Sequence, residues 1–186
     1  MSKIVLAFGR MNPPTIGHEK LIEECAKVAK EEGCDYQIYL SNSHDKKKNP
    51  LDPQTKINLV KKMFPQYANH IHVDREISNP FKVMEKFNTE HEDVIWVAGG
   101  EDVPMYERNF TSHMKKDSPD FFYLNFRVHT AGERSADAEG ATGMSATKMR
   151  GFALQADFQS FRSGMPRTIT DDECKKVMKA IRDYML

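Results

Sequence analysis

The sequence predicts an α/β fold in which a single Rossmann-like, doubly wound parallel sheet carries helices on both faces and is followed by a C-terminal helical segment. Two observations predict it. Short apolar runs alternate with helical patterns along the chain, as in strand–helix–strand units with right-handed crossovers. In addition, residues 94–98 form a continuous apolar run, which is typical of a central parallel strand that is covered on both faces.

The spacing of apolar residues and the helix-boundary residues place the remaining elements. Asp52, Ser145 and Thr170 have the residue type and position of N-caps, and Gly33 those of a C-cap. The expected elements are strands over residues 4–8, 36–40, 71–73, 94–98 and part of 121–128, and helices over 18–32, 53 to 65, 80–87, a segment after Gly100, 145–156 and a segment after Thr170. We predict one domain over residues 1–166 and a C-terminal helix within 167–186 that packs on it.

Composition narrows the class of protein. The 186 residues include 27 basic and 27 acidic ones, a balance that argues against a broad nucleic-acid-binding face or an anionic membrane surface. No apolar run is long enough to span a bilayer and no signal-peptide pattern is present. Cys25, Cys34 and Cys174 lack the spacing of a zinc site, and we expect them to be buried thiols. A cytoplasmic protein is expected, and its oligomeric state stays open.

The segment from Gly9 to His18 carries the first functional signal. It joins the strand over residues 4–8 to a helix start, where backbone N–H groups and the helix dipole favour an anion. Gly17 has no Cβ to keep a phosphate away from the backbone, and the side chains of Thr15 and His18 would supply hydrogen bonds. The alternative for His18 alone is an ordinary helix-terminal histidine.

A second helix start, at residues 143–150, combines hydroxyls with cations. Ser145 and Thr147 precede or accompany Lys148 and Arg150 in the first turns, a set that suits the β- and γ-phosphates of a nucleoside triphosphate. An ordinary capped, charged helix is the alternative. The loop residues Lys46–Lys48 would reach over the same phosphates or simply be solvated.

The end of the strand over residues 94–98 provides candidates for a second substrate. Glu101 follows Gly99 and Gly100 and would accept hydrogen bonds from ribose hydroxyls, or cap the next helix together with Asp102. Trp96 would stack on a substrate ring or belong to the core. The histidines show no metal-ligand spacing, so no protein metal site is expected.

The segments Thr15-Ile16-Gly17-His18 and Met144-Ser145-Ala146-Thr147-Lys148-Met149-Arg150 together resemble the paired motifs of the nucleotidylyltransferase superfamily. The likeness extends over at least residues 3–166. It is greatest to small phage-encoded proteins that look like nicotinamide mononucleotide adenylyltransferases or are described as cytidylyltransferase-like. Many relatives carry Gly-Ser-Asp-Arg after the fourth strand, where this chain has Gly99-Gly100-Glu101-Asp102.

The resemblance implies a nucleotidyltransferase that moves a nucleoside monophosphate from a nucleoside triphosphate to a small phosphate-bearing acceptor and releases pyrophosphate. ATP and nicotinamide mononucleotide, giving NAD, are the first expectation. CTP with a phosphorylated alcohol is the alternative, and a nucleotide-binding module without turnover is the alternative of another class. Mg²⁺ is expected, bound mainly through the substrate phosphates. No nucleic-acid or membrane partner is expected, and a phage origin would place the protein in the host cytoplasm.

The implied site has three groups of residues. The catalytic group is His18, Thr15 and Arg150. The nucleotide-binding group is Gly9, Arg10, Met11, Asn12, Gly17, Lys46, Gly99, Ser145, Thr147 and Lys148. The acceptor-binding group is Gly100, Glu101, Trp96 and Arg134.

Overall fold

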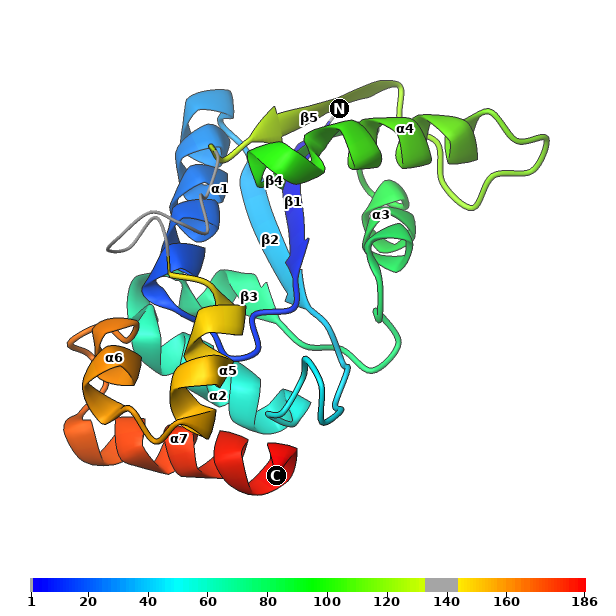
Figure 1. The fold of residues 1–186 in the computed structure, drawn as a ribbon. Helices are drawn as coiled ribbons and strands as arrows, with labels where there is room; N and C mark the ends of the chain where they lie inside the picture. The colour runs from blue at the N-terminus through cyan, green and yellow to red at the C-terminus, as the bar shows by residue number, and fades with distance from the viewer. Residues whose placement is uncertain (1, 133–143) are drawn as a thin grey trace. The chain divides into compact units, whose positions relative to one another are not determined.

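The computed structural model describes residues 2–132 and 144–186 (Figure 1). Its strands are β1 (Lys3–Gly9), β2 (Asp35–Leu40), β3 (Ile71–His72), β4 (Asp93–Ala98) and β5 (Asn125–Thr130). Its α-helices are α1 (Glu19–Glu32), α2 (Pro53–Met63), α3 (Pro80–Asn88), α4 (Val103–Met114), α5 (Ala146–Leu154), α6 (Phe158–Ser163) and α7 (Asp171–Met185). Short 3₁₀ helices lie at η1 (Ile16–His18), η2 (Pro65–His70) and η3 (Gly100–Asp102).

The strands form one sheet in the order β3-β2-β1-β4-β5. β1 pairs with β4 in parallel, from Lys3 opposite Asp93 to Leu6 opposite Trp96, and β4 pairs with β5 in parallel. The chain therefore changes direction across the sheet between β1 and β4, the point at which ligands bind in doubly wound sheets. The predicted Rossmann-like α/β fold is confirmed.

The described residues group into two compact units. The first holds residues 2–9, 20–39 and 74–132, with β1, β4, β5 and most of β2. The second holds residues 10–19, 40–73 and 144–186. Residues on both sides of the expected boundary at 166 lie in this second unit.

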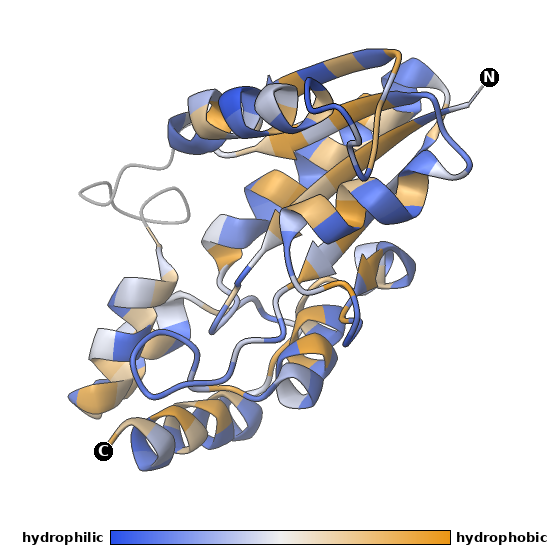
Figure 2. Cartoon of the chain, turned by 90° about the vertical axis from the view of Figure 1, so that its right-hand side faces the viewer, coloured by the Kyte–Doolittle hydropathy of each residue, from blue (hydrophilic) through white to orange (hydrophobic). Residues whose placement is uncertain are grey.

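The core of the first unit is built on the sheet. The strands are rich in hydrophobic residues (Figure 2), and Ile4, Leu6, Val94 and Trp96 belong to one buried cluster. Trp96 has no exposed surface, and its ring lies 4.9 Å from the ring of Phe110 on α4, measured between centroids. The apolar run of β4 is therefore covered, as the sequence predicts.

In the second unit, α5, α6 and α7 contact one another (Figure 1). Buried Met149, Phe161 and Ile181 supply apolar surface from these three helices. The sequence predicts the N-caps of α5 and α7, and both are present: the Ser145 Oγ accepts from the Lys148 N–H at 3.1 Å, and Thr170 begins a capping box. Helix α6 was not expected, because its six residues are too few to show a helical period.

The predicted cap of α2 is also confirmed, since the Asp52 Oδ1 accepts from the Thr55 N–H at 3.0 Å. Cys25 and Cys174 are buried, whereas Cys34 is partly exposed. No helix in the described part of the chain is both long and apolar enough to cross a membrane.

Candidate nucleotide-binding site

The loop that follows β1 folds into a tight local turn at η1. Thr15 is its N-cap and its Oγ1 accepts from the Gly17 N–H at 3.0 Å. The Thr15 N–H in turn donates to Nδ1 of His18 at 2.9 Å. Because Nδ1 accepts this bond, the neutral imidazole carries its proton on Nε2. The turn thus makes Nε2 of His18 a hydrogen-bond donor.

Two long-range hydrogen bonds join this turn to the second motif. The Thr15 Oγ1 donates to the backbone carbonyl of Met144 at 3.0 Å, directly before the N-cap of α5. The Ile16 N–H donates to the carbonyl of Gly164 at 2.9 Å. The structure therefore brings together the two segments that the sequence analysis paired.

This geometry changes how Thr15 acts. Its side chain is fully buried, and a hydroxyl has one proton to donate, which goes to Met144. In this structure Thr15 positions the turn that presents His18, and a direct contact of its hydroxyl with phosphate stays a prediction.

Arg150 links α5 to the same loop. One guanidinium nitrogen donates to the carbonyl of Asn12 at 2.8 Å and another to the Thr147 Oγ1 at 3.2 Å. Partial burial lowers the pKa of Arg150, Arg10 lowers it further, and Asp45 opposes the shift. Asp45 is thus a nearby anion that opposes the effects of burial and of Arg10 on Arg150.

The side-chain amide of Asn12 has a structural role in this loop. Its side chain donates to the carbonyl of Leu51 and accepts from the Leu51 N–H, both at 2.9 Å. Its neighbour Met11 is buried and has φ +45°, in the left-handed region. The side chain of Asn12 thus shapes the loop, and nucleotide binding by Met11 and Asn12 stays a prediction.

The loop over residues 41–51, called the lysine loop because it carries Lys46–Lys48, is held by Asp45 within it and by a contact with α7. Oδ1 of Asp45 accepts from the backbone N–H groups of Lys47 and Lys48 at 3.0 and 2.8 Å. These bonds hold the pKa of Asp45 below its usual range. His44 stacks on Tyr184 of α7, with ring centroids 4.2 Å apart. Lys46 and its two neighbours are exposed.

Sequence reasoning missed Lys56 on α2. Its side chain is fully buried, and Nζ donates to the carbonyl of Arg10 at 2.8 Å and to the carbonyl and hydroxyl of Ser41 at 2.7 and 3.1 Å. Burial lowers the pKa of Lys56 to about 8. The signal that could have found it is its helical spacing to Leu59, Val60 and Met63, which places Lys56 on the buried face of α2.

The start of α5 contributes further polar groups. Ser145 caps the helix, Thr147 is exposed and Lys148 is half-buried. Gly17, in η1, belongs to the same unit. These residues lie where the sequence analysis expects nucleotide contacts, at or next to the two joined segments.

The other candidates belong to the first unit. Gly9 ends β1, and Gly99 follows β4, the strand next to it. The Gly100 N–H donates to the carbonyl of Gly132 at 3.2 Å, and Glu101 is exposed. Asp102 begins α4 without a capping hydrogen bond from its side chain, so the capping role weighed for it is not present.

Trp96 and Arg134 are the other two residues predicted to bind the acceptor. Of the two interpretations of Trp96, ring stacking and core, its complete burial among aromatic rings supports the core. Arg134 lies outside the described residues.

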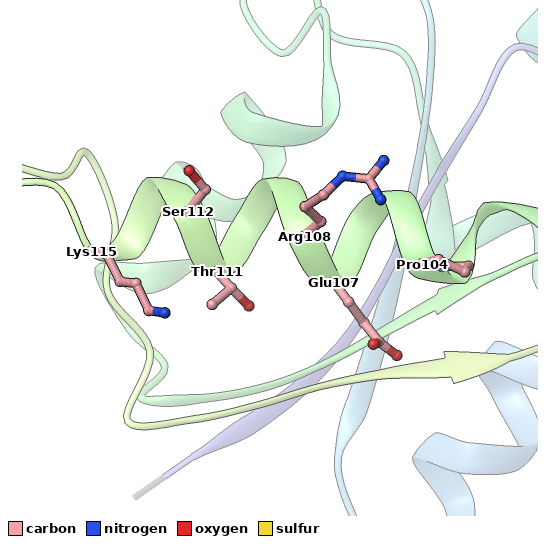
Figure 3. Close-up of a pocket in the computed structure, with 6 residues that line it drawn as sticks. All are labelled: Pro104, Glu107, Arg108, Thr111, Ser112 and Lys115. Carbon is pink, nitrogen blue, oxygen red and sulfur yellow. The ribbon is translucent and has the colours of Figure 1, made fainter.

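The first unit has a surface depression on α4. Its lining comes from α4 and the residue that follows it, including Glu107, Arg108 and Lys115 (Figure 3). None of the residues of the two paired motifs lines it. Among the described residues no group of three or more His, Cys, Asp or Glu is placed to hold a metal ion.

Comparisons with known proteins concern the family and the fold of the chain. A family model described as cytidylyltransferase-like matches residues 6–125. No curated protein sequence matches the chain.

Two solved structures share its fold. A protein assigned as a nicotinate-nucleotide adenylyltransferase from Vibrio parahaemolyticus has a TM-score of 0.51 and 15% identity, over 97% of this chain and 99% of that one. TmcAL from Thermotoga maritima, solved bound with alpha-thio ATP, has a TM-score of 0.57 and 12% identity over 98% of this chain, which spans 56% of that protein. At these identities the likeness concerns the fold. The family model covers well over half of the sequence, and the chain therefore belongs to the cytidylyltransferase-like family, within the nucleotidylyltransferase superfamily.

Proposed function

We propose that this protein transfers a nucleoside monophosphate from a nucleoside triphosphate to a phosphate-bearing acceptor. The observation that carries the proposal is the pair of bonds from Thr15 to Met144 and from Ile16 to Gly164. These bonds hold the turn of His18 against the start of α5 and Arg150. One compact unit thereby supplies both a neutral donor and cationic donors for a chain of phosphates.

The side chains of the site are assigned to particular phosphates of the triphosphate. His18 donates from Nε2 to an oxygen of the α-phosphate, where charge develops during transfer. Arg150, Arg10, Ser145 and Thr147 hold the β- and γ-phosphates. Lys46 and Lys148 add positive charge, and Gly17 admits the phosphates close to the backbone.

The reaction is a direct displacement. An oxygen of the acceptor phosphate forms a bond to the α-phosphorus, and the bond from that phosphorus to the oxygen bridging to the β-phosphorus breaks. Pyrophosphate leaves with that electron pair. Catalysis by this chain consists of alignment and charge stabilisation, with no covalent protein intermediate.

The polar groups described above are donors and cations, which suit phosphates. We therefore propose that Mg²⁺ is held mainly by phosphate oxygens and water, which is its usual mode in such sites. When bound, the ion neutralises charge on the leaving pyrophosphate.

ATP is the first donor that we propose, and nicotinamide mononucleotide the first acceptor, with NAD as the product. One of the two similar structures is assigned as an adenylyltransferase and the other was solved with an ATP analogue, which supports this order of testing. CTP with a phosphorylated alcohol is the second choice, which the description of the family favours. Gly100 and Glu101 are proposed to contact the acceptor.

A nucleotide-binding module without turnover is the alternative of another class. Its support is the pair Glu101-Asp102, which replaces the Asp-Arg pair that many relatives carry.

A pyrophosphate-release assay tests the proposal. ATP and CTP are each combined with nicotinamide mononucleotide and with phosphorylated alcohols, in the presence of Mg²⁺. We expect release that requires both substrates, greatest with ATP and nicotinamide mononucleotide. Binding of a triphosphate without release from any pair would identify the module, and no binding at all would contradict both functions.

A further inference from the structure

The loop over residues 41–51 is fastened at both ends to the segment that follows β1. At its far end, Leu51 forms two backbone hydrogen bonds with the side chain of Asn12. At its near end, the Lys56 ammonium joins both oxygens of Ser41 to the carbonyl of Arg10. This loop carries Lys46–Lys48, so the two fastenings decide where those cations lie.

The contact made by Lys56 is unusual because a charged side chain is fully buried. Among the residues that the structure describes, Lys56 is the only Lys, Arg, Asp or Glu in the buried class. Its three hydrogen bonds go to two carbonyls and a hydroxyl, and no carboxylate is among its partners. A buried charge without a counterion costs free energy, which the hydrogen bonds to these three oxygens offset in part.

The number of acceptors explains why a charged amine stands here. The ammonium has three N–H donors, and each has its own acceptor within 3.1 Å. A neutral amine would donate to only two of these oxygens. The ammonium is therefore the form that donates to all three at once.

We propose that Lys56 is a positioning residue of the nucleotide site, whose buried ammonium fastens the lysine loop to Arg10 and so arranges the cations that receive the β- and γ-phosphates. This inference rests on the proposed function. Loss of Lys56 should weaken binding of the β- and γ-phosphates, because Arg10 and Lys46 are proposed to act there. It should not weaken binding of the α-phosphate by His18, because the turn of His18 is held separately through Thr15.

The test compares binding of tri- and monophosphates by titration calorimetry. Wild type, Lys56→Met and the control Lys61→Met, an exposed lysine of the same helix, are each titrated with ATP and AMP, and with CTP and CMP, at pH 7 with Mg²⁺. Loss of a charged, multiply bonded donor is expected to weaken triphosphate binding about tenfold or more. Monophosphate binding should stay within about twofold of the wild type, and Lys61→Met should behave as the wild type.

A second variant covers the case in which Lys56→Met does not fold. Ser41→Ala removes one acceptor, the hydroxyl at 3.1 Å, and leaves both carbonyls in place. We expect triphosphate binding to weaken about threefold, with monophosphate binding unchanged.

The outcomes separate the two proposals. If Lys56→Met, or Ser41→Ala in its place, binds triphosphates as tightly as the wild type, the inference about Lys56 is overturned while the proposed function stands. An equal loss of mono- and triphosphate binding also overturns it, since the role would then be general stability. If the wild type binds no triphosphate, the proposed function fails and Lys56 has no site to position.

Discussion

The hydroxyl of Thr15 donates a hydrogen bond to the backbone carbonyl of Met144, 129 residues later in the chain. The bond joins the turn that orients His18 to the start of the helix that carries Arg150. The local bond from Thr15 to His18 orients the imidazole, and the distant bond holds its turn against the start of α5. The relationship gives the hydroxyl of Thr15 a structural role in addition to the predicted contact with substrate.

We expect Thr15→Val to lower both stability and turnover. Valine has nearly the same shape, but it leaves the Met144 carbonyl and the Gly17 N–H without their partner. An unsatisfied buried group costs about 1–3 kcal/mol of unfolding free energy, and misplacement of the turn is expected to lower pyrophosphate release by up to about 10²-fold. Urea unfolding and the release assay measure the two effects.

Thr15→Ser is the matched control, because it keeps the hydroxyl and removes only a methyl group. It should retain most of the activity. Equal activity of the Val and Ser variants would show that the bond to Met144 has no role in catalysis.

His18→Asn separates the two nitrogens of the imidazole. The asparagine oxygen stands near the place of Nδ1 and can accept the Thr15 N–H, whereas nothing replaces the donor at Nε2. We expect the thermal unfolding temperature to stay near that of the wild type and pyrophosphate release to fall about 10²–10³-fold. His18→Ala should lose at least as much rate. His70→Ala, at the end of η2 in the same unit, is the control, and a near wild-type rate for His18→Asn would remove His18 from the chemistry.

The sequence could predict what is decided locally. The caps at Asp52, Ser145 and Thr170 depend on residues within three positions, and all three are present. The pairing of the two motifs was also predictable, because their residue types repeat a family pattern. The helical period of α2 places Lys56 on the buried face, but its partners Ser41 and Arg10 could not be found, because other parts of the chain bring them to it.

The same limit applies to roles within the site. The pattern around residues 10–18 indicates polar contacts with phosphate, but it does not tell which polar groups the protein itself uses. Thr15 and Asn12 are used internally, by Met144 and by Leu51. Their partners are 129 and 39 residues away, beyond any local pattern.

Gly164→Ala is expected to disturb the contact between the turn and the residues after α6. A Cβ at this buried position would overlap the Met149 side chain and reach within 3.0 Å of Met144. Because the carbonyl of Gly164 holds the Ile16 N–H, a backbone shift would be passed to the turn. Overpacking of this kind costs about 1–3 kcal/mol, measured by urea unfolding, and turnover should fall with it.

Gly151→Ala is the control for that substitution. Gly151 lies within α5, and a Cβ there meets nothing within 4 Å. Alanine favours helix over glycine by up to about 1 kcal/mol, so this variant should be as stable as the wild type or more so. If Gly164→Ala were equally stable, the close packing around Gly164 would be unimportant.

The start of α7 should make stability depend on pH in acid. A hydrogen bond from Lys62, the Thr170 cap and the charge of Lys62 lower the pKa of Glu173 from 4.5 to about 2. A carboxylate whose pKa is lower in the folded state stabilises the fold above its unfolded pKa, and this stabilisation is lost as the pH falls through the folded value. We therefore expect wild type to be more stable than Glu173→Gln above about pH 5, with a difference that shrinks toward about pH 2. Urea midpoints measured across this range test it.

Asp172→Asn, which changes an exposed residue of the same helical turn, controls for the helix dipole. An identical pH dependence in wild type and Glu173→Gln would show that the Lys62 pair adds nothing to stability.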